Sequence, residues 1–131
     1  CKQAQRDCFQ MFCCLAAPTY AKDFVKSARS GVPTRMHTYK AWKTDCSADM
    51  GVVQVVNKPR NGTLTPSQEN TTIGTSRYDS TRTAHCRGTP ITGFRVDYTS
   101  SPGFRGTDHF QIYVTFGKRR RDYDNYTVNV R

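Results

Sequence analysis

Few residues of this chain combine a reactive side chain with the spacing that catalysis or metal binding requires. The three histidines, His37, His85 and His109, are too far apart to form a short ligand pair, and none lies in an H-E-x-x-H motif. The 10 acidic residues are scattered, so no pair of carboxylates suggests glycosidase chemistry. We therefore expect no metal ion and no cofactor.

Nucleophilic catalysis is equally unsupported. Ser100 and Ser101 are not part of a G-x-S-x-G nucleophile elbow. Asp108 and His109 could suggest a dyad, but neighbouring residues of a strand point to opposite faces of the sheet. The sequence predicts a protein that is not an enzyme.

The six cysteines divide into two groups. Four lie within the first 21 residues, and adjacent Cys13–Cys14 lacks the C-x2-C spacing with which two thiolates share zinc. The remaining two, Cys46 and Cys86, predict a disulfide bond in an oxidising compartment. Because this bond would close a long loop, it would stabilise the fold by roughly 3–4 kcal/mol in the chain-entropy model.

The first 21 residues have the layout of a secretory signal peptide. A basic start, Lys2 to Arg6, precedes an apolar helical stretch of about ten residues that ends near Ala17, and Ala21 is the expected cleavage site. Two alternatives remain open: an amphipathic N-terminal helix that the mature protein keeps, and a lipid-anchored Cys1. We expect export to the periplasm or cell exterior, followed by a polar arm at residues 22–31.

Residues 32–131 predict one β-domain. The chain contains no apolar run of 18 residues, so no transmembrane segment is expected. Apolar and polar residues alternate in residues 94–99, 110–116 and 126–130, which is typical of strands with one buried face. A compact apolar run at residues 52–56 predicts another strand, whereas polar residues 66–80 suggest a long loop or a weak hairpin. These patterns favour an antiparallel β-sandwich of immunoglobulin-like size.

The most specific stretch is residues 98–110, which reads YTSSPGFRGTDHF. Pro and Gly favour a turn, Asp can accept backbone N–H bonds at the bend, and aromatic residues can enter the core. The expected corner residues are Tyr98, Pro102, Gly103, Phe104, Gly106, Asp108 and Phe110. Together with Pro59–Leu64, this stretch resembles the signature of bacterial cadherin-like, immunoglobulin-like domains, including small exported proteobacterial proteins.

The resemblance covers roughly residues 50–131 and implies an immunoglobulin-like or cadherin-like sandwich. In that family some tandem copies coordinate calcium between repeats. Here Asp97 and Asp108 stand among Arg and Lys residues, so we carry over no calcium site. The resemblance implies an architectural role for the corner residues.

Charge is the remaining functional indication. The formal net charge is +10, and Lys118, Arg119, Arg120 and Arg121 form a basic run between two predicted strands. A surface of this kind attracts polyanions by long-range steering and counterion release. The alternative is that the charge only keeps the domain soluble.

We therefore expect a monomeric, non-catalytic interaction or structural module of the bacterial cell envelope. Its expected partners are acidic envelope polymers or another protein. Two other functions remain open: a basic protein that binds lipopolysaccharide, acidic polysaccharide or DNA through the Lys118–Arg121 run, and a small secreted hydrolase or inhibitor.

Overall fold

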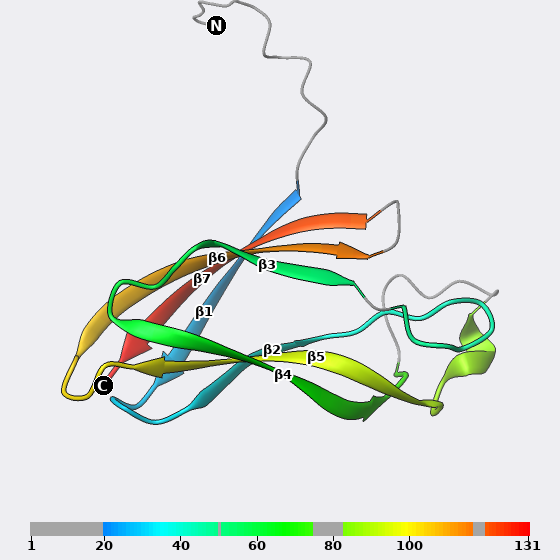
Figure 1. The fold of residues 1–131 in the computed structure, drawn as a ribbon, viewed down its shortest axis with the longest axis horizontal. Helices are drawn as coiled ribbons and strands as arrows, with labels where there is room; N and C mark the ends of the chain where they lie inside the picture. Colours follow the sequence, from blue (N-terminus) through cyan, green and yellow to red (C-terminus); the bar gives the residue numbers. More distant parts are fainter. Residues whose placement is uncertain (1–19, 50, 75–82, 117–119) are drawn as a thin grey trace, which may run out of the picture.

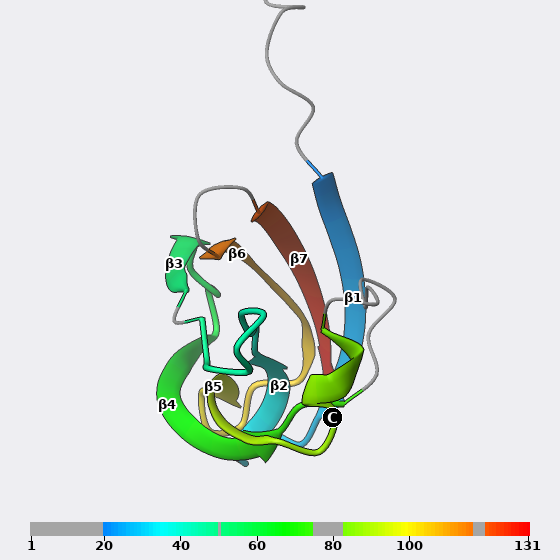
Figure 2. The same ribbon diagram turned by 90° about the vertical axis from the view of Figure 1, so that its right-hand side faces the viewer.

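The described chain folds into two β-sheets. A computed structural model describes residues 20–49, 51–74, 83–116 and 120–131 of the 131-residue chain. One sheet has the strand order β1-β7-β6-β3 and the other has the order β2-β5-β4. Figure 1 shows the strands in two layers, and Figure 2 shows the same layers nearly end-on. This arrangement confirms the expected all-β sandwich.

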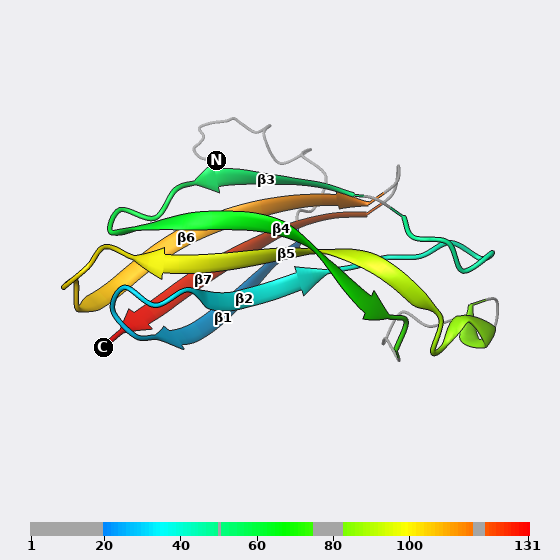
Figure 3. The same ribbon diagram turned by 60° about the horizontal axis from the view of Figure 1, so that its bottom comes forward.

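The four-stranded sheet consists of β1 (Tyr20–Ala28), β3 (Val52–Asn57), β6 (Gly106–Phe116) and β7 (Arg120–Val130). The three-stranded sheet, brought forward in Figure 3, consists of β2 (Thr34–Tyr39), β4 (Gly62–Thr72) and β5 (Pro90–Ser100). Antiparallel pairing prevails, but β1 pairs with β7 in parallel. The wholly antiparallel sandwich that we expected is wrong in this one pairing.

Strand β1 corrects the expected polar arm at residues 22–31. Residues 20–28 form the edge strand of the larger sheet instead. Phe24 and Ala28 pack against the core, while Lys22 and Lys26 occupy the alternate inward positions. Because of these two lysines, the sequence does not show the apolar alternation that predicts a strand. Inward-pointing charges are a common way of protecting an edge strand from unwanted pairing.

The predicted leader overlaps β1, because Tyr20 and Ala21 are its first two residues. The rest of that leader, including its expected helix, lies outside the described residues. No helix in the described ranges is long and apolar enough to cross a bilayer.

Strand β4 corrects the expected loop at residues 66–80, because it continues to Thr72. Its composition concealed it: most of its residues are polar and exposed on both faces. Pro66 lies within it, and proline is tolerated here because β4 is an edge strand that pairs only with β5 among the described strands.

The main core lies between the sheets and includes a column of four aromatic rings. Phe24 stacks on Tyr126 at 4.9 Å between ring centroids, Tyr126 on Phe110 at 4.6 Å, and Phe110 on Tyr98 at 6.1 Å. The interplanar angles of these contacts are 17°, 7° and 8°. Burial of such large rings contributes much of a small domain's hydrophobic stabilisation.

A smaller core closes one end of the sandwich, where the 3₁₀ turn Ala84–Cys86 lies in Figure 1. Ile73, Cys86 and Ile91 are buried there, with Trp42 and Cys46 packed against them. Cys46 and Cys86 form a disulfide bond, which confirms the pairing expected from the cysteine count.

Candidate functional site

The predicted corner residues meet around one buried carboxylate. Asp108 is 3% exposed and accepts a 2.8 Å hydrogen bond from the Tyr98 hydroxyl. Its two oxygens also accept the backbone N–H groups of Arg60 and Asn61, each at 3.0 Å, and Oδ1 accepts that of His109. The donors Arg60 and Asn61 belong to the β3–β4 loop, whereas we expected donors from the bend at Gly106.

The other corner residues shape the β5–β6 turn. Gly103 and Gly106 have positive φ angles of 83° and 137°, which residues other than glycine rarely adopt. Phe104 is partly buried against the main core, and Phe110 is 3% exposed within it. Pro102 is exposed in the turn. The corner therefore links the β5–β6 region to the β3–β4 loop.

The predicted basic run falls largely outside the described residues. Lys118 and Arg119 are not described, and Arg120 and Arg121 begin β7, where they pair with Phe116 and Thr115. The position and contacts of this basic side-chain cluster therefore stay a prediction.

The histidines lie in three separate environments. His37 is packed between Phe24 and Tyr39, with ring centroids 5.6 Å and 4.6 Å away. His85 lies beside the disulfide, its Nε2 being 3.6 Å from Cys86 Sγ. Cys46, His85 and Cys86 are the one group of potential metal ligands found among the described residues, but sulfurs in a disulfide provide no thiolate.

A polar cluster is buried near the β1 edge of the core. The Tyr39 hydroxyl donates to Asp124 Oδ2 at 2.7 Å and lies 2.7 Å from the Tyr126 hydroxyl. Burial raises the pKa of Asp124, and burial together with the neighbouring Tyr126 raises that of Tyr39. The hydrogen bonds of this buried cluster link Tyr39 of β2 to Asp124 and Tyr126 of β7.

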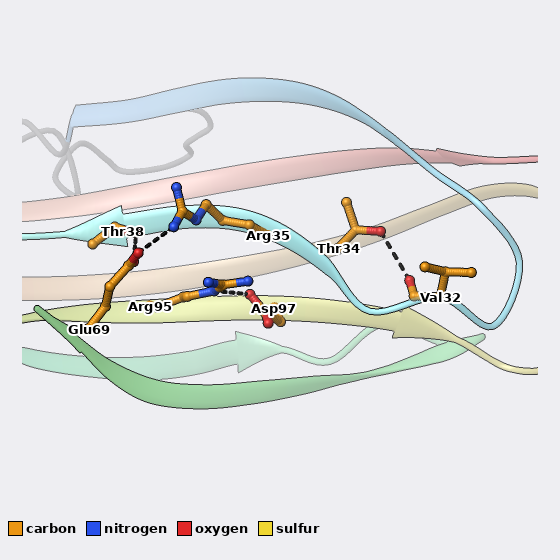
Figure 4. Close-up of polar contacts among 7 residues, drawn as sticks. All are labelled: Val32, Thr34, Arg35, Thr38, Glu69, Arg95 and Asp97. Atoms are coloured by element: carbon orange, nitrogen blue, oxygen red, sulfur yellow. Dashed lines mark hydrogen bonds and ion pairs between the residues drawn. The ribbon is translucent and has the colours of Figure 1, made fainter.

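The outer face of the three-stranded sheet is charged and ion-paired, as Figure 4 shows. Arg95 Nε lies 2.7 Å from Asp97 Oδ1, and Arg35 pairs with Glu69. Glu69 also accepts a 2.7 Å bond from Thr38, although β5 lies between β4 and β2. It can reach across because its neighbour on β5 is Gly93, which has no side chain.

The outer face of the four-stranded sheet has a different chemistry. One hydrogen-bonded row crosses all four strands, and we call it the amide row: Asn57, Gln111, Asn125 and Asp23. Asn57 Nδ2 donates to Gln111 Oε1 at 3.4 Å, Gln111 Nε2 to Asn125 Oδ1 at 2.7 Å, and Asn125 Nδ2 to Asp23 Oδ1 at 3.1 Å.

The amide row follows from the register of the strands. Gln111 pairs with Asn57 on one side and with Asn125 on the other, and Asn125 pairs with Asp23. A bulge between Val55 and Asn57 brings Asn57 into the row, since it shifts the alternation of β3 by one residue. The side chains of Asp23 and Asn57 are exposed, and those of Gln111 and Asn125 are partly exposed.

Aromatic and polar residues flank the amide row. On one side Tyr113 and Tyr123 are cross-strand partners with ring centroids 4.7 Å apart, and we call them the tyrosine pair. On the other side His109 Nδ1 lies 3.2 Å from Thr127 Oγ1. An open depression of about 270 Å³ is lined by Asn57, His109, Phe110, Gln111, Asn125, Tyr126 and Thr127.

We call this surface, formed by the amide row, the tyrosine pair, His109 and Thr127, the polar face. Sequence reasoning missed it, because the outward residues of each alternating strand read only as solvated positions. The available signal was an amide at the outward positions of β6 and β7, but its meaning depends on strand register.

Comparisons with known proteins do not assign the chain to a family. No family model and no curated protein matches it. Among solved structures it is similar to "Solution Structure of Amebosin", with 10% sequence identity and a TM-score of 0.45 over 88% of this chain and 100% of that chain. Likeness at this level implies neither family nor function.

Proposed function

We propose that this chain is an exported, non-catalytic interaction module of the bacterial cell envelope that contacts its partner through the polar face. The observation that carries the proposal is the amide row, a line of exposed and partly exposed hydrogen-bonding side chains across a whole sheet. Such groups can exchange bonds with a partner at little conformational cost, because the strands hold them in place.

The module class that we propose is immunoglobulin-like or cadherin-like. Its support is the division of the strands, β1-β7-β6-β3 against β2-β5-β4, with the first strand parallel to the last. Further support comes from the two stretches of the resemblance, which contact each other through Asp108 and the N–H groups of Arg60 and Asn61. The Cys46–Cys86 disulfide is compatible with export.

The test is sedimentation of the purified protein with Gram-negative envelope fragments. We expect the wild type to sediment with the fragments, and we expect Gln111→Ala combined with Asn125→Ala to weaken binding at least tenfold. The matched control is Gln68→Ala combined with Asn70→Ala, which removes two exposed amides from β4 and should bind like the wild type. Equal binding of all three proteins, or no binding of the wild type, would contradict the proposal.

A polyanion-binding protein is the second candidate, favoured by the net charge of +10 and the Lys118–Arg121 run. This candidate predicts that binding to lipopolysaccharide or DNA weakens steeply as salt rises. It also predicts a further loss for Arg119→Ala combined with Arg120→Ala. Binding that is insensitive to both changes excludes it.

A further inference from the structure

We infer that the ligand of the polar face is a neutral polysaccharide chain lying across the strands along the amide row. This inference rests on the proposed function and names the ligand class of the same surface. It is carried by the hydrogen-bonding capacity, the aromatic surface, the dimensions and the charge of the polar face.

The amide row keeps hydrogen-bonding capacity beyond its internal bonds. A carboxamide has two N–H donors and an oxygen with two lone pairs. Gln111 uses one donor toward Asn125 and one lone pair for Asn57, so one donor and one lone pair remain. Paired donors and acceptors at one side chain suit a sugar hydroxyl, because a hydroxyl both donates and accepts.

The tyrosine pair provides the apolar surface that a sugar ring also needs. A pyranose has C–H groups on its faces and hydroxyls at its edge, so it binds best where aromatic and polar groups lie side by side. Tyr113 and Tyr123 are both partly exposed, and each lies one outward position from the amide row, Tyr113 after Gln111 on β6 and Tyr123 before Asn125 on β7. Tyrosine is suited to this role because its ring is apolar and its hydroxyl is polar.

The dimensions favour a polymer over an enclosed small molecule. Neighbouring strands lie about 4.8 Å apart, so the four residues of the amide row span about 14 Å, a length that matches a few sugar units in sequence. The adjoining depression of about 270 Å³ is open. A site for a free small molecule would instead enclose most of its ligand.

The charge of the polar face favours an uncharged polysaccharide over an acidic one. The protein carries a net charge of +10, yet within the amide row, the tyrosine pair and the His109–Thr127 pair the one formal charge among the described residues is the carboxylate of Asp23. That negative charge would repel an acidic polymer. The opposite outer face, with Arg35, Glu69, Arg95 and Asp97, has charges that are already paired.

The test is isothermal titration of the full chain with neutral hexasaccharides of glucan, mannan, galactan and chitin type, beside dextran and dextran sulfate as a neutral and an anionic polymer with one backbone. We expect at least one neutral hexasaccharide to bind with an affinity that changes less than twofold between 50 and about 200 mM salt, a range in which phosphate-type contacts lose orders of magnitude. We expect Gln111→Ala and Tyr123→Ala each to weaken binding about tenfold, as the loss of about 1.4 kcal/mol implies.

Gln68→Ala is the matched control and should bind like the wild type; melting curves of all variants establish that they fold. The inference is overturned if no neutral saccharide binds, if only dextran sulfate binds, or if Gln111→Ala and Tyr123→Ala bind normally. If these outcomes occur while envelope sedimentation still depends on Gln111 and Asn125, the polar face binds another partner and the proposed function survives. If sedimentation is also independent of them, the proposed function fails as well.

Discussion

At the scale of single residues, Asp108 shows how one side chain holds two loops. Its carboxylate accepts three backbone N–H groups and the Tyr98 hydroxyl within a site that is almost closed to water. A carboxylate in this position satisfies three backbone donors and the buried Tyr98 hydroxyl, which would be costly to leave without a partner. The residue therefore acts as a structural anchor, and its neighbour His109 faces the opposite side of β6.

Replacing Asp108 tests this anchor. We expect Asp108→Ala to lower the free energy of unfolding by about 3 kcal/mol, because several hydrogen bonds to a charged group are lost together. Tyr98→Phe should cost only about 1 kcal/mol, because the backbone bonds to Asp108 remain. Urea denaturation measures both, with exposed Thr107→Ala as the control. If Asp108→Ala and Tyr98→Phe lower the free energy of unfolding by similar amounts, the role of Asp108 as a structural anchor is contradicted.

Asp124 predicts an unusual pH dependence of stability. Burial raises its pKa, with a smaller contribution in the same direction from Asp122, while the bond from Tyr39 and the charges of Lys22 and His37 lower it. A raised pKa means that the folded state holds the proton more tightly than the unfolded state does. The resulting stabilisation is complete below the unfolded value of about 3.9 and is lost as pH rises through the folded pKa.

The variant Asp124→Asn isolates this effect because it cannot ionise. We subtract the unfolding free energy of Asp124→Asn from that of the wild type. This difference should fall as pH increases from about 4, and it should level off above the pKa of Asp124 in the folded state. His37 contributes in the opposite sense, since burial lowers its pKa and its protonation below about 6.5 favours unfolding. The variant lacks the Asp124 charge that raises the pKa of His37, so this penalty is larger in the variant and adds to the expected fall. A difference that is constant with pH, or that rises, argues against the raised pKa.

The residue scale also shows what sequence alone can and cannot provide. The Cys46–Cys86 pairing was predictable because two cysteines remained after the first 21 residues were set aside, and the alternation of β6 was predictable because it is local. The amide row was not, because Asn57 and Gln111 are 54 positions apart and Asp23 and Asn125 are 102 apart. Only the register of the strands brings such residues together.

At the scale of elements, side-chain composition explains why β1 and residues 66–72 of β4 were not predicted as strands. Both are edge strands. The inward positions of β1 include Lys22 and Lys26, and most residues of β4 are polar, so neither shows the apolar alternation of a strand with a buried face. Their backbones pair with β7 and β5 over their whole lengths. Edge strands with Lys22, Lys26 or Pro66 are also protected from pairing with other chains.

The crossing of β5 by Glu69 gives a prediction at this scale. A Cβ atom at Gly93 would lie 3.1 Å from Thr38 Cγ2 and 3.2 Å from the Tyr39 carbonyl oxygen. We expect Gly93→Ala to reduce the free energy of unfolding by about 1–2 kcal/mol, because the added methyl group is forced against β2. It should also separate Glu69 from Thr38.

The matched control is Gly74→Ala, because a Cβ atom there meets nothing within 4 Å. Thermal unfolding of both variants measures the difference, and the amide shifts of Thr38 and Glu69 report the local change. If Gly93→Ala is as stable as Gly74→Ala, then β2 can shift to accept the methyl group without loss of stability. The contact of Glu69 with Thr38 across β5 would then not require glycine at position 93.

At the scale of the whole molecule, the two cores are held together differently, because only the smaller one contains the disulfide bond. The main core joins both sheets through the aromatic column, whereas the smaller core depends on the Cys46–Cys86 bond between a loop and a 3₁₀ turn. Small domains with a modest apolar core commonly use a disulfide. The polar face lies on β3, β6, β7 and β1, and none of the residues of the smaller core belongs to these strands.

Removing the disulfide should therefore loosen one end while the sandwich persists. We expect Cys46→Ser combined with Cys86→Ser to lower the free energy of unfolding by roughly 4 kcal/mol, the chain-entropy value for a separation of 40 residues. The one tryptophan of the chain, Trp42, packs in the smaller core, so its fluorescence reports that end alone. Its emission should shift to longer wavelength in the variant while far-UV circular dichroism keeps its β-sheet signal.

Binding adds a second readout to the same variant. Because β3, β6, β7 and β1 supply the polar face and none of them carries either cysteine, the double serine variant should retain the wild-type affinity for envelope fragments at temperatures where the sheet is folded. Loss of binding together with an unchanged circular dichroism spectrum would mean that the disulfide end supports the face, contrary to this division. Loss of the sheet signal itself would mean that the two cores unfold as one unit.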